Sequence, residues 1–327
     1  MNKVNVAFIG CGQFAKVFHY STLSEMDDVE IVAACDLNEE LLNETCDRFN
    51  VEARYTDYNE MFDKEEIDAV YAIMRPQYLK SVALDVIKAG KHIFVEKPAG
   101  LNTAETKELA EAAEKASVKS GVGTNRRFAK VYRKAKEEVE KNGHISTVIS
   151  EFHKNLDSEM FGMSVLTADG LHLVDPLRWM LGEAVEVNSH AETWFDNGNW
   201  EHSKNVWQAL IRFESGASAV FTSNRRCGAR REYMEVHGNG VSCYIRAPET
   251  LEIWRDGEKE PELITGEELA GDGHMLKTYG YWDENRDFIE SIKEDRMPEC
   301  NLSDNLKTME LCDEINNGSS MELKGRC

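Results

Sequence analysis

Short apolar runs alternate with amphipathic stretches over the first 123 residues. The runs are rich in Val, Ile and Ala, and we predict strands over residues 3–9, 29–35, 68–74, 92–95 and 121–124. The intervening stretches have helical spacing, and we predict helices over residues 13–26, 38–49, 76–88 and 103–118. Asn38 and Thr103 stand at helix N-cap positions, and Gly90 follows the end of a helix. This alternation predicts an α/β domain in which helices cover both faces of a doubly wound parallel sheet.

The pattern changes after residue 130. One helix is predicted over residues 131–141, and another segment of helical spacing over 170–181. Strand-like runs surround the second segment, at residues 147–152, 185–194, 207–213, 217–222, 233–237, 242–246 and 251–254. Helices are predicted at about 282–295 and 303–316. We therefore expect an α+β domain with a largely antiparallel open sheet and one inserted helix. The expected boundaries are 1–123 and 124–327, with the C-terminal helix able to pack back on the first domain.

Charge and cysteine usage narrow the range of partners and compartments. The 327-residue chain carries 38 Lys and Arg against 59 Asp and Glu, a net charge of −21. Such a chain repels phosphate backbones and anionic lipid at long range, so we expect neither nucleic acid nor membrane as a partner. No apolar run reaches the ~18 residues of a membrane span, and no secretory signal is evident. Eight scattered cysteines without a CxxC pair, and histidines without ligand spacing, indicate reduced thiols, a cytoplasmic location and no metal.

A glycine-rich turn follows the first predicted strand and precedes a predicted helix. Residues Gly10-Cys11-Gly12-Gln13-Phe14-Ala15 fit G-x-G-x-x-G/A, in which the glycines permit a tight turn and a close approach to a pyrophosphate. Asp36 lies at the tip of the second strand, 24 residues after Gly12, where an acid accepts the ribose hydroxyls of NAD. Because no Arg follows at positions 37 and 38, NAD is favoured over NADP. The alternative is a strand-to-helix turn with incidental glycines and a solvated acid.

Longer segments carry a family resemblance. The chain reads AGKHIFVEKPA at residues 89–99, GVGTNRRF at 121–128, DGLHLVDPLRWMLG at 169–182 and VHGNGVSCYI at 236–245. With the glycine turn, these segments resemble the glucose–fructose oxidoreductase and inositol dehydrogenase (Gfo/Idh/MocA) family over nearly the whole chain. The resemblance implies an NAD-dependent enzyme that oxidises a secondary alcohol of a sugar, sugar derivative or cyclitol. It also implies that residues 1–123 bind the cofactor and that the later sheet serves substrate binding or a homodimer or homotetramer interface.

The resemblance also assigns site residues. Lys97 holds the position of the family lysine near nicotinamide and substrate, and His172 that of the family histidine, which can accept the hydroxyl proton. Many members carry Asp four residues before that histidine. Here Ala168 stands there, so either Asp169 fills the role or the role is absent. The expected cofactor contacts are Gly10, Gly12, Gln13, Phe14, Ala15, Asp36, Arg75, Glu96 and Lys97. Asp175 is expected to be more structural than chemical, and Leu79 replaces a frequent family histidine.

A dense group of basic residues stands out in this acidic chain. It consists of Arg225, Arg226, Arg230 and Arg231, which either recognise a carboxylate or phosphate on the substrate or pair with the abundant acids. Pairing is the favoured interpretation. His153 and the Tyr279–Trp282 aromatics are weaker site candidates. Two other functions remain open. One is a non-catalytic NAD-binding sensor, which the missing Asp at position 168 favours and the retained Lys97 and His172 disfavour. The other is a glycoside-cleaving enzyme with transient NAD redox.

Overall fold

A computed structural model describes residues 3–318, and the chain divides into two compact units. The first unit ends at Asn125 and resumes at Gly280–Lys307; the second contains Arg126–Tyr279 and resumes at Thr308. The expected second domain of 124–327 thus differs from the second unit at residues 280–307, which cluster with the first unit. The physical reason is that Phe288 and Ile289 pack in a core of the first unit, against Phe8, Tyr71 and Phe94.

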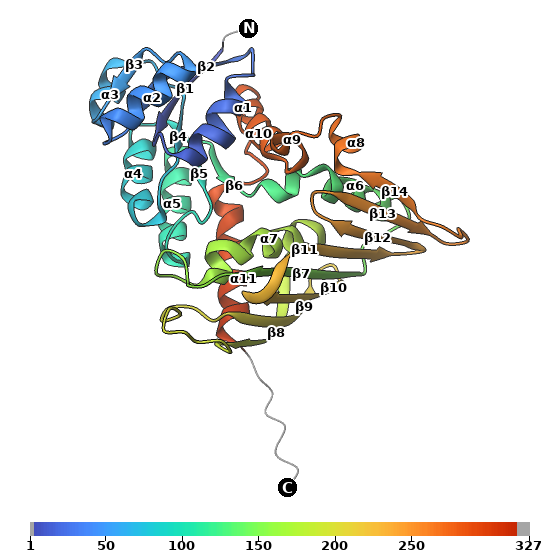
Figure 1. Cartoon of the computed structure of the whole chain (residues 1–327). Helices are drawn as coiled ribbons and strands as arrows, with labels where there is room; N and C mark the ends of the chain where they lie inside the picture. Colours follow the sequence, from blue (N-terminus) through green and yellow to red (C-terminus); the bar gives the residue numbers. More distant parts are fainter. Residues whose placement is uncertain (1–2, 319–327) are drawn as a thin grey trace. The chain divides into compact units, whose positions relative to one another are not determined.

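The first unit is built on a six-stranded parallel sheet in the order β3-β2-β1-β4-β5-β6 (Figure 1). Its strands are β1 (Val4–Ile9), β2 (Val29–Cys35), β3 (Ala53–Tyr55), β4 (Ala69–Ala72), β5 (His92–Glu96) and β6 (Ser120–Gly123). The strand order reverses between β1 and β4. In such sheets ligands bind beyond the carboxyl ends of the strands, at this reversal.

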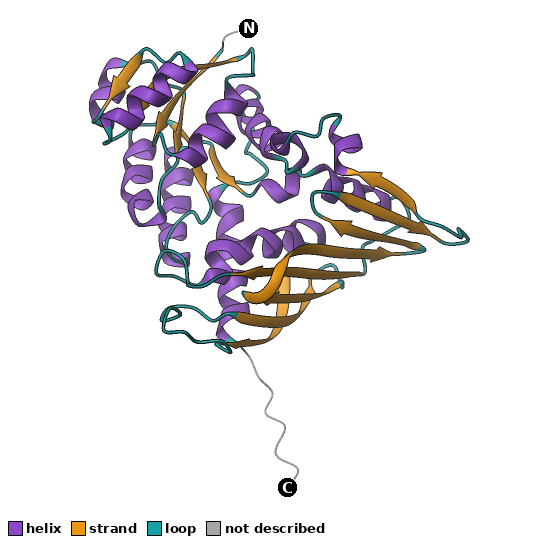
Figure 2. Cartoon of the chain, in the orientation of Figure 1, coloured by secondary structure: helices purple, strands orange, loops and turns teal. Residues whose placement is uncertain are grey.

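Helices pack on both faces of this sheet, as the purple elements of Figure 2 show. They are η1 (Ala15–Tyr20), α1 (Ser21–Leu23), α2 (Glu39–Phe49), α3 (Tyr58–Lys64), α4 (Pro76–Lys88), α5 (Thr103–Ala116) and α10 (Tyr281–Lys293). Successive residues of β1 enter different cores: Ala7 and Ile9 pack with α3, α4 and α5, whereas Val6 and Phe8 pack with η1, α1, α2 and α10. Because side chains alternate along a strand, both faces are covered. The predicted doubly wound sheet is confirmed.

Local chemistry explains where the prediction of this unit held and where it failed. Asn38 caps α2 as expected, its side chain accepting from the Leu41 amide. For α5 the cap is Asn102, whose side chain accepts from the Glu105 amide, and the assignment of Thr103 was wrong. The predicted helix at 13–26 is wound as a π-helix over Ala15–Tyr20. Strand β3 and helix α3 were missed because each is too short for a periodic pattern.

The second unit contains an eight-stranded sheet in the order β14-β13-β12-β11-β7-β10-β9-β8. Its strands are β7 (Thr147–Asn155), β8 (Ala184–Glu192), β9 (Val206–Phe213), β10 (Ser218–Asn224), β11 (Arg226–Gly238), β12 (Val241–Arg246), β13 (Thr250–Arg255) and β14 (Glu262–Thr265). Every pairing is antiparallel except that of β7 with β10. The predicted largely antiparallel sheet is confirmed, although β14 was missed.

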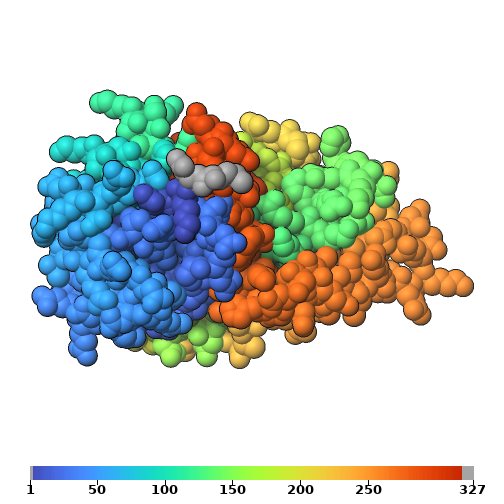
Figure 3. Space-filling view, turned by 90° about the horizontal axis from the view of Figure 1, so that it is seen from above, coloured from blue at the N-terminus to red at the C-terminus, as the bar shows by residue number. Residues whose placement is uncertain are grey.

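Helices cover one face of this sheet and leave the other open. The core contains apolar side chains of α6 (Lys130–Glu140), α7 (Leu171–Leu181) and α11 (Leu302–Asn317), the last of which starts in the first unit. The inserted helix is α7, preceded by the π-helical turn η3 (Leu166–Gly170). In Figure 3 the green surface of α6 lies beside the orange surface around β13 and α8 (Gly266–Ala270), in agreement with their contacts. Leu210 and Val220 are half exposed on the open face.

Two findings bear on the expectations from composition. Within residues 3–318, no helix is both long and apolar enough to cross a bilayer. The seven cysteines of this range are all free thiols, and Cys327 lies outside the described residues. Burial raises the pKa of several of them, to about 12 for Cys11, Cys35 and Cys243. Such thiols are poor nucleophiles near neutral pH.

Candidate functional site

The glycine turn lies between β1 and η1. Gly10 has φ +109°, and a Cβ at this position would lie 2.1 Å from the carbonyl oxygen of Ile73, so only glycine fits. At Gly12 a Cβ would meet no described atom within 4 Å. Ala15 is fully buried, which lets the helix pack close to the sheet. The turn thus combines a forced backbone at Gly10 with an open approach at Gly12, as a pyrophosphate requires.

Asp36 is tied to this turn. Its Oδ2 accepts a hydrogen bond from the Cys11 amide at 2.8 Å, and its Oδ1 accepts one from the Asn38 amide at 2.9 Å. The half-buried carboxylate is therefore fixed beside the glycine turn. A carboxylate offers about four acceptor sites, so two remain for ribose hydroxyls.

The other predicted cofactor residues of this unit follow β4 and β5. Arg75 is the exposed N-cap residue of α4, just beyond β4. Glu96 is the last residue of β5, and Lys97, half buried, follows it. The turns after β1, β2, β4 and β5 all lie at the carboxyl edge of one parallel sheet. The fold therefore brings the glycine turn, Asp36, Arg75 and Lys97 to the same edge. Leu79 is buried in the core of this unit.

A buried histidine on η1 contacts the end of β5, and sequence reasoning missed it. His19 is fully buried; its Nε2 lies 3.0 Å from Glu96 Oε1, and its Nδ1 lies 3.1 Å from Asn285 Oδ1. The only signal in the sequence was a polar residue on an otherwise apolar helix face, one turn after Ala15.

In the second unit, His172 is the second residue of α7 and only 8% exposed. One turn later Asp175 forms a two-pronged ion pair with Arg127, in which Arg127 Nε and Nη2 each donate at 2.6 Å. The Thr308 hydroxyl donates to the same carboxylate at 3.0 Å. Both charged side chains are almost completely buried. These contacts fix α7, and hence the backbone that carries His172.

Asp169 lies in η3 and is held by two cations. It accepts from Lys154 Nζ at 2.7 Å and from Arg225 Nη1 at 2.9 Å. Burial lowers the pKa of Lys154, and the Asp169 carboxylate offsets part of that effect. Ala168 is fully buried. Lys154 was missed because β7 extends to Asn155, three residues beyond the predicted strand.

The arginines of the dense group all pair with acids of this unit. The pairs are Arg225–Asp169, Arg226–Asp157, Arg230–Glu232 and Arg231–Glu151. Arg126 also binds Glu232, through Nε and Nη2. Burial alone would raise the pKa of Glu232, but Arg126 and Arg230 hold it below its ordinary value. The geometry is that of the favoured pairing interpretation.

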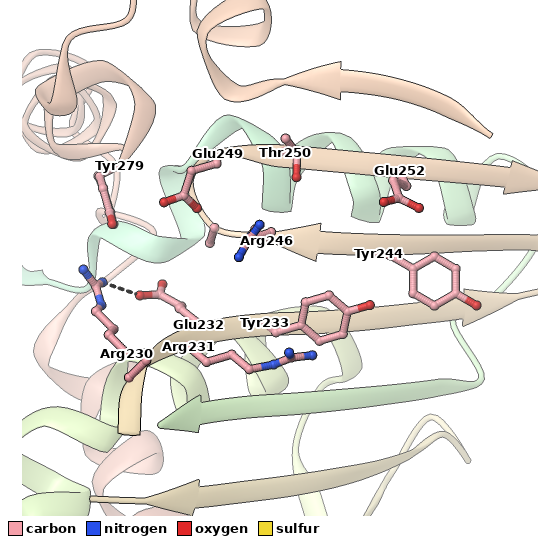
Figure 4. A pocket seen from close by; sticks show the side chains of 12 residues that line it. Arg230, Arg231, Glu232, Tyr233, Tyr244, Arg246, Glu249, Thr250, Glu252 and Tyr279 are labelled. Atoms are coloured by element: carbon pink, nitrogen blue, oxygen red, sulfur yellow. Dashed lines mark hydrogen bonds and ion pairs between the residues drawn. The ribbon is translucent and has the colours of Figure 1, made fainter. Parts of the chain in front are cut away.

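A cavity of about 680 Å³ opens on the sheet where β11, β12 and β13 lie side by side. Figure 4 shows Arg230, Glu232 and Tyr279 at one end of it, and Tyr233 and Tyr244 further along the strands. The Tyr279 ring lies 4.9 Å from the guanidinium carbon of Arg126. Aromatic faces next to charged hydrogen-bonding groups suit a polar small molecule.

The remaining candidates have structural contacts. His153 Nδ1 accepts from the Asn224 amide, and burial lowers its pKa. Tyr281, in the first unit, packs against Phe18. Across residues 3–318, no group of three or more His, Cys, Asp or Glu side chains could hold a metal ion.

The chain is similar to known proteins in both sequence and fold. The family profile described as "Oxidoreductase family, NAD-binding Rossmann fold" matches residues 4–124, and the "GFO/IDH/MocA C-terminal domain" matches residues 132–242. Myo-inositol 2-dehydrogenase of Thermotoga maritima is 27% identical over 318 residues, covering 90% of this chain and 90% of that protein. D-apiose dehydrogenase of Paraburkholderia graminis is 25% identical over 346 residues, covering 97% and 89%. A solved structure of levoglucosan dehydrogenase with NADH and levoglucosan has the same fold, with a TM-score of 0.84 at 20% identity and 97% coverage of both chains. Both domains, in this order, place the chain in the Gfo/Idh/MocA family, whose first domain binds NAD and whose members are oxidoreductases.

Proposed function

We propose that this enzyme oxidises a secondary alcohol of a sugar, sugar derivative or cyclitol, with Lys97 and His172 as its acid–base groups. The observation that carries the proposal is the position of Lys97 at the carboxyl edge of the parallel sheet, the edge that also bears the glycine turn and Asp36. That edge is where this sheet type binds a dinucleotide. NAD, when bound, accepts the hydride that leaves the alcohol carbon.

Residues of the chain would bind the reacting hydroxyl oxygen of the substrate and accept its proton. Lys97, as an ammonium group, donates a hydrogen bond to the reacting oxygen and polarises it. His172 accepts the hydroxyl proton as the carbonyl forms. The Asp175–Arg127 pair holds α7 in place, which supports a fixed orientation for the His172 backbone. Asp169 serves to hold Lys154 and Arg225 beside the same helix.

A polyhydroxylated substrate is supported by the relatives and by the cavity. The curated relatives are named for myo-inositol and D-apiose. The cavity lining, which includes neither Lys97 nor His172, combines three tyrosines with both arginine and glutamate side chains. Such a mixture of donors and acceptors matches neutral hydroxyl groups better than a single anion.

The test is a panel of sugars and cyclitols with NAD and with NADP, read by NADH absorbance. Lys97→Ala should lower kcat about 10²–10⁴-fold while the NAD dissociation constant stays near that of the parent. Lys88→Ala is the matched control, because Lys88 is an exposed lysine at the end of α4. Near-parental kcat in Lys97→Ala would refute the catalytic assignment. If no sugar or cyclitol of the panel supports NAD reduction, the proposed substrate class is refuted.

The open face of the eight-stranded sheet supports a homodimer or homotetramer. Leu210 and Val220 pair on adjacent strands there and are 51% and 41% exposed. Replacing both with Lys should lower the mass measured by light scattering to that of one chain; an unchanged mass would reject this face. The cytoplasmic location stays a prediction.

A further inference from the structure

Both ring nitrogens of His19 face hydrogen-bond acceptors. Nδ1 lies 3.1 Å from Asn285 Oδ1, and Nε2 lies 3.0 Å from Glu96 Oε1. A neutral imidazole has one N–H and one acceptor nitrogen, so it can donate to only one of the two. The arrangement therefore requires a proton beyond those of a neutral histidine and a carboxylate.

The number of protons that the arrangement requires depends on the orientation of the Asn285 side-chain amide. Asn285 Nδ2 donates to the carbonyl oxygen of Tyr281 at 2.7 Å, within α10. Turning the amide over would place its oxygen against that carbonyl, and two acceptors would then meet at hydrogen-bond distance. Asn285 Oδ1 must therefore face His19, and His19 Nδ1 must carry a hydrogen.

The second proton lies between His19 Nε2 and Glu96 Oε1. The pair is then either an imidazolium with a carboxylate or a neutral imidazole with a carboxylic acid. Both forms hold the same number of protons, and in both the pair has no net charge. A bare carboxylate next to a neutral histidine, with net charge −1, would leave two acceptors facing each other at 3.0 Å.

His19 lies among aromatic side chains of the first unit's core. His19 is fully buried, and its ring lies 5.1 Å from that of Phe94 and 5.6 Å from that of Tyr71. The ionisable groups near this site on the packed elements are Glu96 on β5, Tyr71 on β4, and both the buried Glu284 and Arg286 on α10, which act on Tyr71 electrostatically. Burial raises the pKa of Tyr71 well above its ordinary value, so Tyr71 stays neutral and supplies no charge. An uncompensated negative charge is costly in such an apolar site.

The Glu96 carboxyl group also contacts the backbone of Lys97. Its Oε2 accepts from the backbone amide of Lys97 at 3.2 Å. A Cβ on Gly123 would come within 2.5 Å of Glu96 Oε1, so the carboxyl group lies flat against the neighbouring strand β6. The Glu96 carboxyl group is therefore held from three sides, by His19, by Gly123 and by the peptide of Lys97.

We propose that His19 is a positioning residue that, together with Asn285, keeps Glu96 charge-compensated and oriented beside the catalytic lysine. The inference rests on the proposed role of Lys97 for its effect on turnover, but not for the proton itself. In the parent enzyme Lys97 follows a residue whose charge is balanced. Without His19, Glu96 becomes a bare carboxylate, which favours the ammonium form of Lys97.

The first experiment measures the proton directly, on the unsubstituted full chain without substrate. Nitrogen-15 NMR of the histidine side chains and carbon-13 NMR of the glutamate carboxyl groups, near neutral pH, should show either hydrogens on both ring nitrogens of His19 or a protonated Glu96 carboxyl group. In Glu96→Gln, which removes the acid, only Nδ1 should keep its hydrogen. A single protonated ring nitrogen together with an ionised Glu96 carboxylate in the parent protein, or two protonated ring nitrogens in Glu96→Gln, would overturn the proposal.

The second experiment measures the consequence in turnover. In His19→Gln the alkaline limb of the kcat–pH profile for alcohol oxidation should move to higher pH, because an uncompensated Glu96 carboxylate stabilises a neighbouring cation. His92→Asn is the matched control, because His92 is a half-buried histidine at the opposite end of the same strand. An unmoved profile in His19→Gln, or an equal shift in His92→Asn, would overturn the positioning role. Lys97→Ala with parental turnover would instead refute the proposed function and leave the NMR result intact.

Discussion

Replacing Asp175 with Asn should destabilise the second unit strongly and leave the chemistry largely intact. The substitution keeps the side-chain volume but removes the charge that compensates Arg127. Asp175 and Arg127 are 1% and 3% exposed, and two hydrogen bonds of 2.6 Å join them. Hydrogen bonds to charged groups contribute about 1.5–3 kcal/mol each, so breaking both while Arg127 stays buried costs about 3–6 kcal/mol. Removing one partner of a buried ion pair typically lowers the free energy of unfolding by about 3–5 kcal/mol.

Urea unfolding followed by tryptophan fluorescence is the appropriate assay. Trp282 belongs to the first unit, and the other five tryptophans belong to the second, so the signal reports mainly the part of the chain that contains the pair. A loss of about 3–5 kcal/mol should lower the urea midpoint by about 1–2 M. At temperatures where the variant stays folded, its kcat should remain within about tenfold of the parent.

Two variants make the result interpretable. Glu186→Gln breaks an exposed ion pair in which Glu186 Oε2 lies 3.2 Å from Arg212 Nε. It should lower the free energy of unfolding by no more than about 1 kcal/mol. Arg127→Met combined with Asp175→Leu removes both charges and should regain most of the loss. If Asp175→Asn costs less than about 1 kcal/mol and lowers kcat a hundredfold, Asp175 acts in the chemistry and the reasoning is refuted.

Three further substitutions test charges elsewhere. Burial alone would raise the pKa of Glu138, but hydrogen bonds from two lysines and an arginine hold it at about 2, below its ordinary 4.5. Because the folded-state pKa is the lower one, its stabilising contribution is complete above about pH 4.5 and is lost toward pH 2, so Glu138→Gln should flatten acid unfolding in that window. Asp36→Ser should narrow the preference for NAD over NADP in dissociation constants, and tighter NADP binding by the parent would contradict the role of Asp36. Arg230→Met should raise KM about equally for neutral and acidic sugars, because Arg230 is paired with Glu232. A rise in KM confined to acidic sugars would indicate that Arg230 recognises an anion.

Patterns confined to neighbouring residues were sufficient for much of the fold. Helix α4 begins at Pro76 and ends at Lys88 as predicted, since Pro favours the first helical turn and Gly90 follows the end. The second strand was also predicted to the residue. Such signals are local, because capping and side-chain alternation depend on residues within a few positions of one another.

The sequence alone determined the two sheet types, the glycine turn, Asp36 and the segment that carries Lys97, because each follows from a short pattern. It left open which acids the arginines bind, what surrounds Asp169 and what the histidine after the glycine turn contacts. Glu96 and His19 are 77 positions apart, and His19 and Asn285 are 266 apart. Only the tertiary structure brings such groups together, since the partner of a buried charge is set by which strands and helices become neighbours. The assignment of residues 280–307 to the first unit has the same cause: helix α10 has an apolar face, but the packing of the whole chain decides which sheet that face covers.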